Sequence, residues 1–131
     1  MTMRELKVRA WYKPYKQMCQ VESLRFDENG VYTAVLIEEP FYDRRIVEAD
    51  EIVIEQFTGL KDKNGTEIYE GDVVKVEGDG EIYRVEWIRS GFGLEPRYNS
   101  PRYPVLGNVE LRKKIEVIGN IHENPELLEE K

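Results

Sequence analysis

The sequence predicts a mainly β protein made of short antiparallel strands joined by tight turns. Three observations lead to this prediction. Apolar residues recur at every second position in several segments, which is the pattern of half-buried strands. Glycines and Asn-Gly pairs, which favour turns, separate these segments. No segment carries the apolar period of a long amphipathic helix.

Residues 1–57 are expected to form an N-terminal β subdomain. Residues 7–12 alternate in polarity and the pattern stops at Pro14, so a first strand is predicted there. The clearest signal is a hairpin over residues 21–37, turned by Asn29-Gly30. This pair is typical of a two-residue type I′ turn, in which both central residues need a positive φ.

The expected hairpin turn also sets the register of the two strands. It places Leu24 opposite Val35 and Phe26 opposite Thr33. Leu24 and Phe26 then share one apolar face with Val35, and a slip of one residue would expose them.

Residues 58–131 are expected to form the second subdomain of one compact unit, an SH3-like small β barrel. Strands are predicted at residues 73–76 and 82–87, separated by glycine turns. Asn124 followed by Pro125 has the pattern of a helix start, with Asn as the N-cap, so a short C-terminal helix should follow. Likeness to a barrel is an argument about fold and implies no chemistry.

Composition excludes several classes of protein. Hydrophobic residues make up 40% of the 131 residues, enough for a core. The single cysteine and the single histidine argue against a disulfide framework, a Cys-rich zinc site and a His-pair metal site. No apolar run approaches the roughly 20 residues that cross a bilayer, and no secretory h-region begins the chain. We expect an intracellular domain without cofactor or metal, not associated with membranes.

Charge is distributed in blocks along the chain. The formal net charge is −7, but residues 17–83 carry −11 whereas residues 84–114 carry +4. The blocks are interpreted first as segments that lie beside each other in the fold or across a subunit contact. The alternative is a basic face that meets an anionic partner, which the acidic total opposes.

Three segments carry a resemblance to a known family. Residues 58–74, TGLKDKNGTEIYEGDVV, resemble the central signature of the YopX family of phage and prophage proteins. The opening Arg9-Ala10-Trp11 with Lys16-Gln17-Met18 and residues 117–128, VIGNIHENPELL, are similar to its terminal motifs. The resemblance implies a small, largely β protein in the cytoplasm of a bacterial host, and it implies no activity and no catalytic residues.

The most suggestive constellation for binding combines arginines and tyrosines after residue 95. Its members are Arg97, Tyr98, Arg102, Tyr103, Arg112 and Lys113. Arginine and tyrosine are favoured anchors in protein interfaces, so protein recognition is the first interpretation. Packing within a loop is the second. Phosphate clamping with base stacking is the third.

Other candidate sites have simpler structural explanations. Cys19 and His122 could form a nucleophile and base, but a lone cysteine near strand residues is more often a core residue. The glycines of the loop at residues 59–71 explain turn geometry without a ligand, and no phosphate-loop pattern occurs there. A carboxylate group would have to converge to bind metal; its members are Asp43, Glu48, Asp50 and Glu51.

The sequence therefore leads to a non-enzymatic, protein-binding accessory protein that associates with itself. Exposed sheet edges in a small β fold need a cover, which a second copy or a host or phage protein could supply. A nucleic-acid-associated factor in phage replication or regulation is the alternative.

Overall fold

The chain is mainly β, as the sequence predicts, and divides into two compact units, Met1–Gln56 and Phe57–Lys131. The structure is a computed structural model that describes residues 7–37, 45–78, 80–88, 91–96 and 113–129. The sequence predicts the division after residue 57. None of the described helices is both long and apolar enough to span a membrane.

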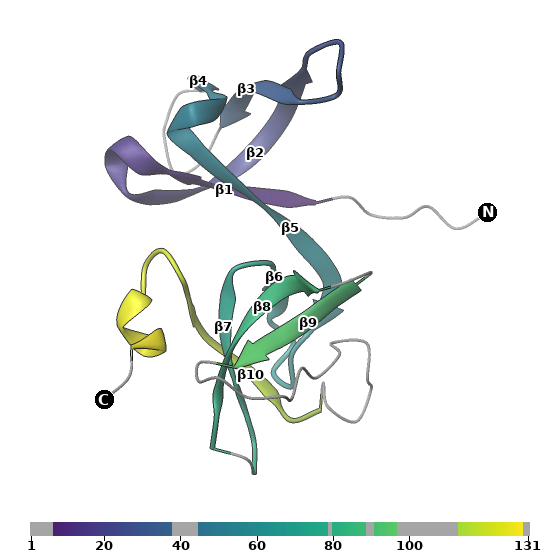
Figure 1. The fold of residues 1–131 in the computed structure, drawn as a ribbon, viewed down its shortest axis with the longest axis vertical. Helices are drawn as coiled ribbons and strands as arrows, with labels where there is room; N and C mark the ends of the chain where they lie inside the picture. Colours follow the sequence, from purple (N-terminus) through teal and green to yellow (C-terminus); the bar gives the residue numbers. More distant parts are fainter. Residues whose placement is uncertain (1–6, 38–44, 79, 89–90, 97–112, 130–131) are drawn as a thin grey trace, which may run out of the picture. The chain divides into compact units, whose positions relative to one another are not determined.

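The first unit is built on one antiparallel sheet with the order β4-β3-β2-β1-β5 (Figure 1). Short 3₁₀ turns, η1 (Lys13–Tyr15) and η2 (Ala49–Glu51), join β1 to β2 and β4 to β5. β5 continues past the unit boundary, and its last residues pair with β6 of the second unit. The strands are β1 (Val8–Tyr12), β2 (Gln17–Phe26), β3 (Tyr32–Ile37), β4 (Arg45–Glu48) and β5 (Ile52–Lys61).

A small core stabilises this first sheet. Its buried members come from β1, β2, β4 and β5, and they are Ala10, Tyr12, Cys19, Val47 and Ile52. Alternation along β1 explains the choice, because Ala10 and Tyr12 point to one face while Arg9 and Trp11, which point to the other, are only partly buried.

The hairpin β2–β3 has the predicted pairing at its centre but not at its end. Leu24 lies opposite Val35, as expected. The register then shifts between Arg25 and Phe26, so that Phe26 lies opposite Tyr32 rather than Thr33. The Phe26 side chain is 58% exposed, and its predicted burial is wrong. The shift follows from a turn longer than the one assumed.

The turn itself is not type I′. Among the described residues of this turn only Gly30 has a positive φ, at +80°, and Asn29 does not. The Asp27 side chain explains the difference, because its Oδ1 accepts hydrogen bonds from the backbone N–H groups of Asn29 at 2.8 Å and Val31 at 3.0 Å. Gly30 N–H bonds to Asp27 O at 3.1 Å. A type I turn with a following left-handed glycine results.

The second unit contains a four-stranded antiparallel sheet with the order β10-β7-β8-β9 (Figure 1). The short strand β6 (Glu67–Tyr69) pairs with the end of β5. SH3-like topology stays a prediction. The sheet strands are β7 (Asp72–Val76), β8 (Ile82–Ile88), β9 (Gly91–Pro96) and β10 (Ile115–Asn120).

Alternating side chains of this sheet form the larger core. Val74, Val76, Tyr83, Val85, Leu94 and Ile115 are buried together with Ile68 of β6. Leu60, Phe92 and Val117 pack partly buried against them. Val74 lies opposite Tyr83, and Val85 opposite Leu94, so that cross-strand pairs on one face build the core.

The C-terminal helix is a single 3₁₀ turn, η3 (Pro125–Leu128), that begins with proline as predicted. Asn124 occupies the N-cap position, as predicted, but its side chain makes no capping hydrogen bond. Its Oδ1 instead accepts a hydrogen bond from Asn120 N–H at 3.3 Å. The Asn124 side chain therefore bonds to the end of β10, which precedes it, and not to the first turn of η3.

Candidate functional site

The β8–β9 hairpin carries a charged cluster on one face. Arg84 of β8 lies directly opposite Glu95 of β9, and its Nη2 donates to Glu95 Oε2 at 2.8 Å. Glu86 is two residues beyond Arg84 and so points to the same face. Arg84 Nε lies 2.6 Å from Glu86 Oε1 as an ion pair, although its N–H is not aimed at the oxygen. The Arg84 guanidinium thus forms ion pairs with two carboxylates.

The two carboxylates of this triad titrate in opposite directions. Burial and a hydrogen bond with Glu95 raise the pKa of Glu86 to about 7. Hydrogen bonds with Glu86 and Arg84 lower the pKa of Glu95. Below about pH 7 the pair therefore holds one proton, mainly on Glu86, and one negative charge, mainly on Glu95, which Arg84 balances.

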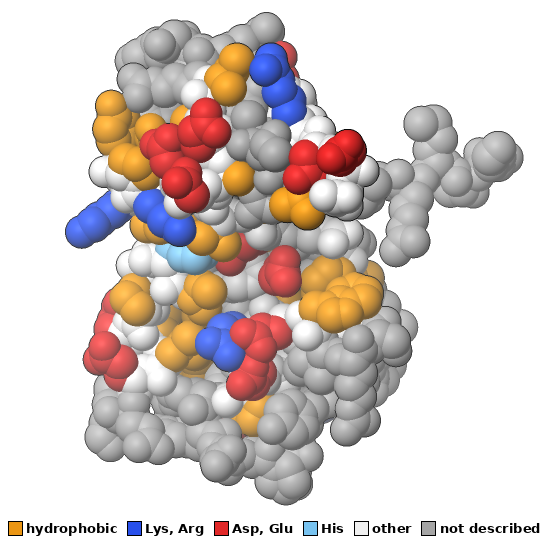
Figure 2. Space-filling view, turned by 45° about the horizontal axis from the view of Figure 1, so that its top comes forward, with side chains coloured by type: hydrophobic (Ala, Val, Ile, Leu, Met, Phe, Trp, Pro, Cys, Tyr) orange, Lys and Arg blue, Asp and Glu red, His pale blue; other side chains and the backbone are white. Residues whose placement is uncertain are grey.

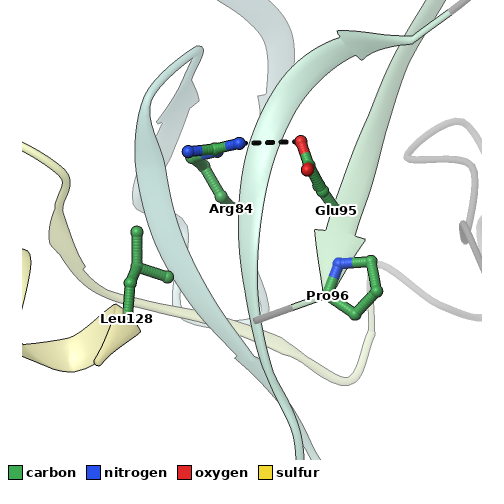
Figure 3. Close-up of a pocket in the computed structure, with 4 residues that line it drawn as sticks. All are labelled: Arg84, Glu95, Pro96 and Leu128. Carbon is green, nitrogen blue, oxygen red and sulfur yellow. Dashed lines mark hydrogen bonds and ion pairs between the residues drawn. The ribbon is translucent and has the colours of Figure 1, made fainter. Parts of the chain in front are cut away.

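A small pocket of about 170 Å³ lies beside the triad (Figure 3). Arg84 and Glu95 extend into it from neighbouring strands, Leu128 approaches from η3, and Pro96 stands at the end of β9. The triad can hold and exchange a proton there. The volume is below the roughly 300 Å³ at which small-molecule sites begin.

The other face of the same hairpin ends in an exposed aromatic pair. Tyr83 and Val85 are buried, but the next residue on that face, Trp87, is 56% exposed. Phe92 of β9 lies opposite Trp87, with ring centroids 5.0 Å apart in an edge-to-face arrangement. The pair lies near the turn end of the hairpin, and Trp87 presents a large apolar surface to solvent.

A second pocket, of about 420 Å³, is lined by both signs of charge. Lys63 Nζ lies 3.6 Å from Glu77 Oε2 and 3.7 Å from Glu116 Oε2. Lys75 is the cross-strand partner of Glu116, and Lys114 is the fifth charged residue of this lining. Paired charges of this kind are typical of a solvated ion-pair network.

Figure 2 shows the same mixing of charge over the face that it displays, where acidic and basic side chains lie next to one another. Arg84, the first basic residue of the +4 block, is engaged by two carboxylates and is not available to a phosphate. Both carboxylates belong to the same block as Arg84, so these ion pairs do not join blocks of opposite sign. Arg9, which precedes the acidic block, does pair with Glu55 inside it, as expected if oppositely charged segments lie beside each other.

The central signature motif is organised by the carboxylate of Asp62. Asp62 is 7% exposed, and its Oδ1 accepts from the N–H groups of Asn64 at 2.8 Å and Thr66 at 2.9 Å. Its Oδ2 accepts from Val117 N–H of β10 at 2.9 Å. Lys63 N–H adds a bond to Ile115 O at 3.0 Å. The loop is thus a structural element that binds the edge of β10.

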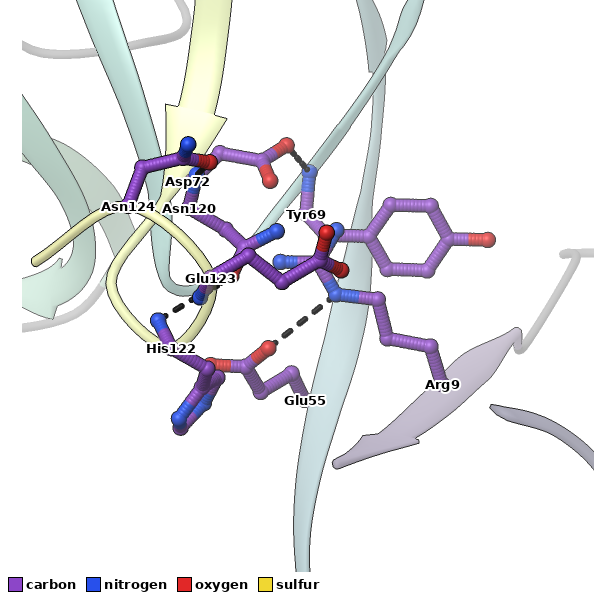
Figure 4. A network of polar contacts seen from close by, with 8 residues as sticks. All are labelled: Arg9, Glu55, Tyr69, Asp72, Asn120, His122, Glu123 and Asn124. Carbon is purple, nitrogen blue, oxygen red and sulfur yellow. Dashed lines mark hydrogen bonds and ion pairs between the residues drawn. The ribbon is translucent and has the colours of Figure 1, made fainter. Parts of the chain in front are cut away.

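Backbone geometry explains the end of the central motif. Gly71 has a φ of +87°, and its N–H bonds to Val85 O while its carbonyl accepts from Ile121 N–H, each at 2.9 Å. Asp72 Oδ2 accepts from Tyr69 N–H at 2.7 Å (Figure 4). The central and C-terminal motifs therefore meet through hydrogen bonds.

The C-terminal motif forms a tight polar turn around Asn120 (Figure 4). Asn120 Oδ1 accepts from the N–H groups of His122 at 3.0 Å and Glu123 at 2.9 Å. Asn124 packs so closely over Gly119 that a Cβ there would lie 2.5 Å from its Oδ1. Glycine and the two asparagines of this motif are thus explained by the turn.

The first unit contains a buried ion pair within its sheet. Arg9 of β1 lies opposite Glu55 of β5, and Arg9 Nε donates to Glu55 Oε1 at 3.0 Å (Figure 4). The Glu55 side chain is 4% exposed, so the pair is held away from solvent. Such pairs fix strand register more than they add stability.

Neither of the other catalytic candidates gains support in the described residues. Cys19 is 2% exposed, and burial raises the pKa of its thiol, which disfavours the reactive thiolate. Asp43 lies outside the described residues, Glu48 and Asp50 are exposed, and Glu51 accepts from Tyr12 OH at 3.4 Å. No group of three potential metal ligands occurs in the described part of the chain.

The predicted binding constellation is largely untested by the structure. Lys113 is exposed in the turn before β10. The other five members lie outside the described residues; they are Arg97, Tyr98, Arg102, Tyr103 and Arg112. Their role in partner binding stays a prediction.

The Arg84–Glu86–Glu95 triad was not found from sequence. The period of two shows that Arg84 and Glu86 share a face, and this signal was available. Glu95 joins them only because the hairpin turns so that Ile88 lies opposite Gly91, which sets Arg84 against Glu95. A register counted back from Ser90-Gly91 would have found the pair.

Comparison with known proteins identifies the family. The model of the family described as YopX protein matches residues 7–129. The chain belongs to the YopX family. The crystal structure of protein EF1440 from Enterococcus faecalis is similar, with a TM-score of 0.69 and 30% identity over 97% of this chain and 100% of that one.

A second solved structure, protein yopX from Bacillus subtilis, has a TM-score of 0.59 and 23% identity. The match covers 95% of this chain and 96% of that one, and it supports the fold alone. No curated protein matches the chain in sequence. The resemblance inferred from the three sequence motifs is thus confirmed.

Proposed function

We propose that this YopX-family chain is a non-enzymatic protein-binding module that associates with itself through the aromatic end of the β8–β9 hairpin. One observation carries the proposal: Trp87 is 56% exposed although Phe92 holds it in place. An ordered, exposed tryptophan loses little conformational freedom when it is covered, so it is a favourable anchor for a partner.

The charged face of the same hairpin supports binding rather than catalysis. Its pocket of about 170 Å³ leaves little room for a substrate beside Arg84 and Glu95. The larger pocket has charged residues of both signs, and Lys63 is already engaged by two carboxylates. Partner contact at an exposed apolar end requires neither pocket.

Multi-angle light scattering across a range of micromolar concentrations tests the proposal. Wild type should show a mass that rises with concentration toward a dimer. Trp87→Ala should weaken this association roughly tenfold or more, the loss expected for an aromatic anchor. Tyr15→Ala is the matched control, because Tyr15 is also 56% exposed but lies in the first unit. A monomer at every concentration, or equal effects of both variants, would contradict self-association at this site.

The nucleic-acid alternative is tested on the same samples. Titration with single- and double-stranded oligonucleotides at low salt should give no binding if the basic residues serve the fold. Binding that weakens steeply as salt rises would favour phosphate contacts and overturn the protein-binding interpretation. A phage or prophage role in the bacterial cytoplasm stays a prediction from the family resemblance.

A further inference from the structure

The two Asn-Gly turns of this chain have the same internal hydrogen bonds. They span residues 27–31 and 62–66, and each begins with aspartate. In each turn the aspartate Oδ1 accepts from the N–H groups of the third and fifth residues at 2.8 to 3.0 Å, and the aspartate carbonyl accepts from the glycine N–H at 3.1 Å. Gly30 and Gly65 have φ values of +80° and +82°. Local geometry is therefore almost the same in the two turns.

An asparagine that precedes glycine can lose its side-chain amide without an enzyme. The glycine nitrogen gives up its proton and attacks the asparagine Cγ. A cyclic succinimide forms as the bond from Cγ to Nδ2 breaks, and the amide nitrogen leaves as ammonia with that proton. Water then opens the ring at either carbonyl, which gives aspartate or isoaspartate. Glycine favours the attack because it has no side chain to obstruct a close approach to its backbone.

In both turns the glycine nitrogen is held by a hydrogen bond. Gly30 N–H and Gly65 N–H donate to the aspartate carbonyls, so each turn must open before the nitrogen can attack. Both asparagines and both glycines are exposed, and a Cβ added at either glycine would meet nothing within 4 Å. Exposure and steric access are thus alike at the two sites, and the frequency of local opening must distinguish them.

The two turns differ in the contacts that keep them closed. The Asp62 turn is bonded to β10 twice, because Val117 N–H donates to Asp62 Oδ2 at 2.9 Å and Lys63 N–H donates to Ile115 O at 3.0 Å. Among the described residues, no hydrogen bond joins residues 27–31 to another part of the chain. Opening the second turn must therefore break two hydrogen bonds that the first turn does not have.

We propose that Asn29 is a site of spontaneous deamidation in the folded chain, and that the bonds to β10 protect Asn64 from the same reaction. The neighbouring charges favour the opposite order. Lys63 precedes Asn64 and Glu28 precedes Asn29, and a nearby cation favours the deprotonated amide whereas a carboxylate disfavours it. Faster conversion at Asn29 is therefore a consequence of folding and not of local sequence.

The product changes an exposed apolar hairpin end. Phe26 and Val31 flank the turn, and each residue is 58% exposed. Asp27 and Glu28 already place carboxylates between them. Conversion of Asn29 adds a further negative charge, and the isoaspartate form also lengthens the main chain by one carbon. Deamidation therefore alters both the charge and the backbone of this end of the hairpin as the protein ages.

Peptide mass mapping after incubation of the full chain measures both sites. Wild type is held at physiological temperature and mildly alkaline pH, then digested at acid pH, where the reaction is slow. The peptide that contains Asn29 should show the mass change of NH₂ to OH, in separate aspartate and isoaspartate forms. Asn64 should convert more slowly by roughly tenfold or more, because two further hydrogen bonds oppose opening. Equal rates, or faster conversion at Asn64, would overturn the proposal.

The same incubation in urea shows whether folding causes the difference. Without the turns and without β10, Asn64 should convert at least as fast as Asn29, because Lys63 precedes it. If Asn29 stays faster by the same factor in urea, the difference belongs to the sequence and β10 has no protective role.

A substitution at Asp62 tests the protection directly. Asp62→Asn keeps the turn acceptor Oδ1 and removes the acceptor of Val117 N–H, so conversion at Asn64 should rise several-fold. Asp27→Asn is the matched control and should leave conversion at Asn29 close to that of wild type, since Asp27 uses Oδ1 for both turn bonds. Circular dichroism checks that both variants keep their strands. An unchanged rate at Asn64 in folded Asp62→Asn would overturn the role of β10.

Discussion

The strands β10 and β9 stand at opposite edges of one sheet and differ in how their outer edges are covered. β10 is held by a turn that is distant in sequence, because Asp62 bonds to Val117, 55 residues further along. β9 receives no such bond from any described residue. The centre of β9 is nevertheless covered, because Gly93 and Leu94 are buried, so only the β10 edge has its covering contacts among the described residues. The family's central signature therefore has a structural role, and we place partner contact on the hairpin instead.

The largest expected effect comes from opening the β10 edge. Asp62→Ala removes the acceptor of three backbone N–H groups, one of which belongs to Val117 in the sheet. Leaving buried donors unsatisfied should lower the free energy of unfolding of the second unit by about 3 kcal/mol. Urea denaturation measures the loss.

The first unit supplies the matched control for this substitution. Asp27 makes the same two turn bonds, to Asn29 and Val31, but it is exposed. Asp27→Ala should therefore cost about 1 kcal/mol or less. Equal losses for the two variants would show that Asp62 does no more than form its turn.

A subtler substitution separates the turn from the edge. Asp62 uses Oδ1 for the turn and Oδ2 for Val117, so Asp62→Asn keeps one acceptor and turns the other into a donor. The variant should lose about 1 to 2 kcal/mol, because the Val117 N–H then has no acceptor. Asp27→Asn should be close to neutral, since Asp27 uses Oδ1 for both turn bonds.

Amide proton NMR locates the effect of Asp62→Asn. The Val117 amide should lose its protection against exchange while the Thr66 amide keeps it. If both amides keep their protection, the bond to Oδ2 does not close the edge.

These turns also show what sequence could predict and what it could not. The Asn-Gly pairs indicated both turns, and alternation gave the Leu24–Val35 pairing of the first hairpin. The turn type was wrong because the preceding aspartate competes for the local N–H groups, a side-chain effect that the Asn-Gly preference ignores. The Asn-Gly pattern predicted the position of the turn, whereas the Asp27 side chain determined the turn type.

Long-range placement was harder to predict. Nothing near Asp62 in the sequence reveals that Val117 will meet its second oxygen. Trp87 continues the alternation of Tyr83 and Val85, yet it is exposed; the pairing of β7 with β8 ends at Arg84, before Trp87 is reached. The alternating pattern predicts which face of the sheet a side chain points to, whereas the burial of that side chain depends on which elements cover the face.

The charged face of the β8–β9 hairpin should respond to pH. Because the pKa of Glu86 is raised to about 7 from an ordinary value of 4.5, the folded chain binds this proton more tightly than the unfolded chain. Its contribution to stability is full below the ordinary value and is lost as pH rises through about 7. The pKa of Glu95 is lowered, so its contribution to stability is present above its ordinary pKa and is lost as pH falls through the lowered value.

Urea denaturation between about pH 5 and about pH 8 measures this slope. Wild type should lose less than about 1 kcal/mol relative to Glu86→Gln over that range, because solvent screens a side chain that is about one third exposed. Glu116→Gln on β10 controls for the loss of one carboxylate. Parallel curves for wild type and Glu86→Gln would contradict the shared proton.

The smallest effect on monomer stability should come from charges placed at Gly91, where a side chain would meet nothing within 4 Å. Both Gly91→Lys and Gly91→Glu should unfold within about 0.5 kcal/mol of wild type. Gly91 lies opposite Ile88, the neighbour of Trp87, so either charge would stand beside the proposed aromatic anchor. Both substitutions should therefore weaken self-association by roughly threefold or more, because a charge at an apolar contact must be desolvated. Light scattering measures both. Masses equal to that of wild type at every concentration would contradict a contact at this end of the hairpin.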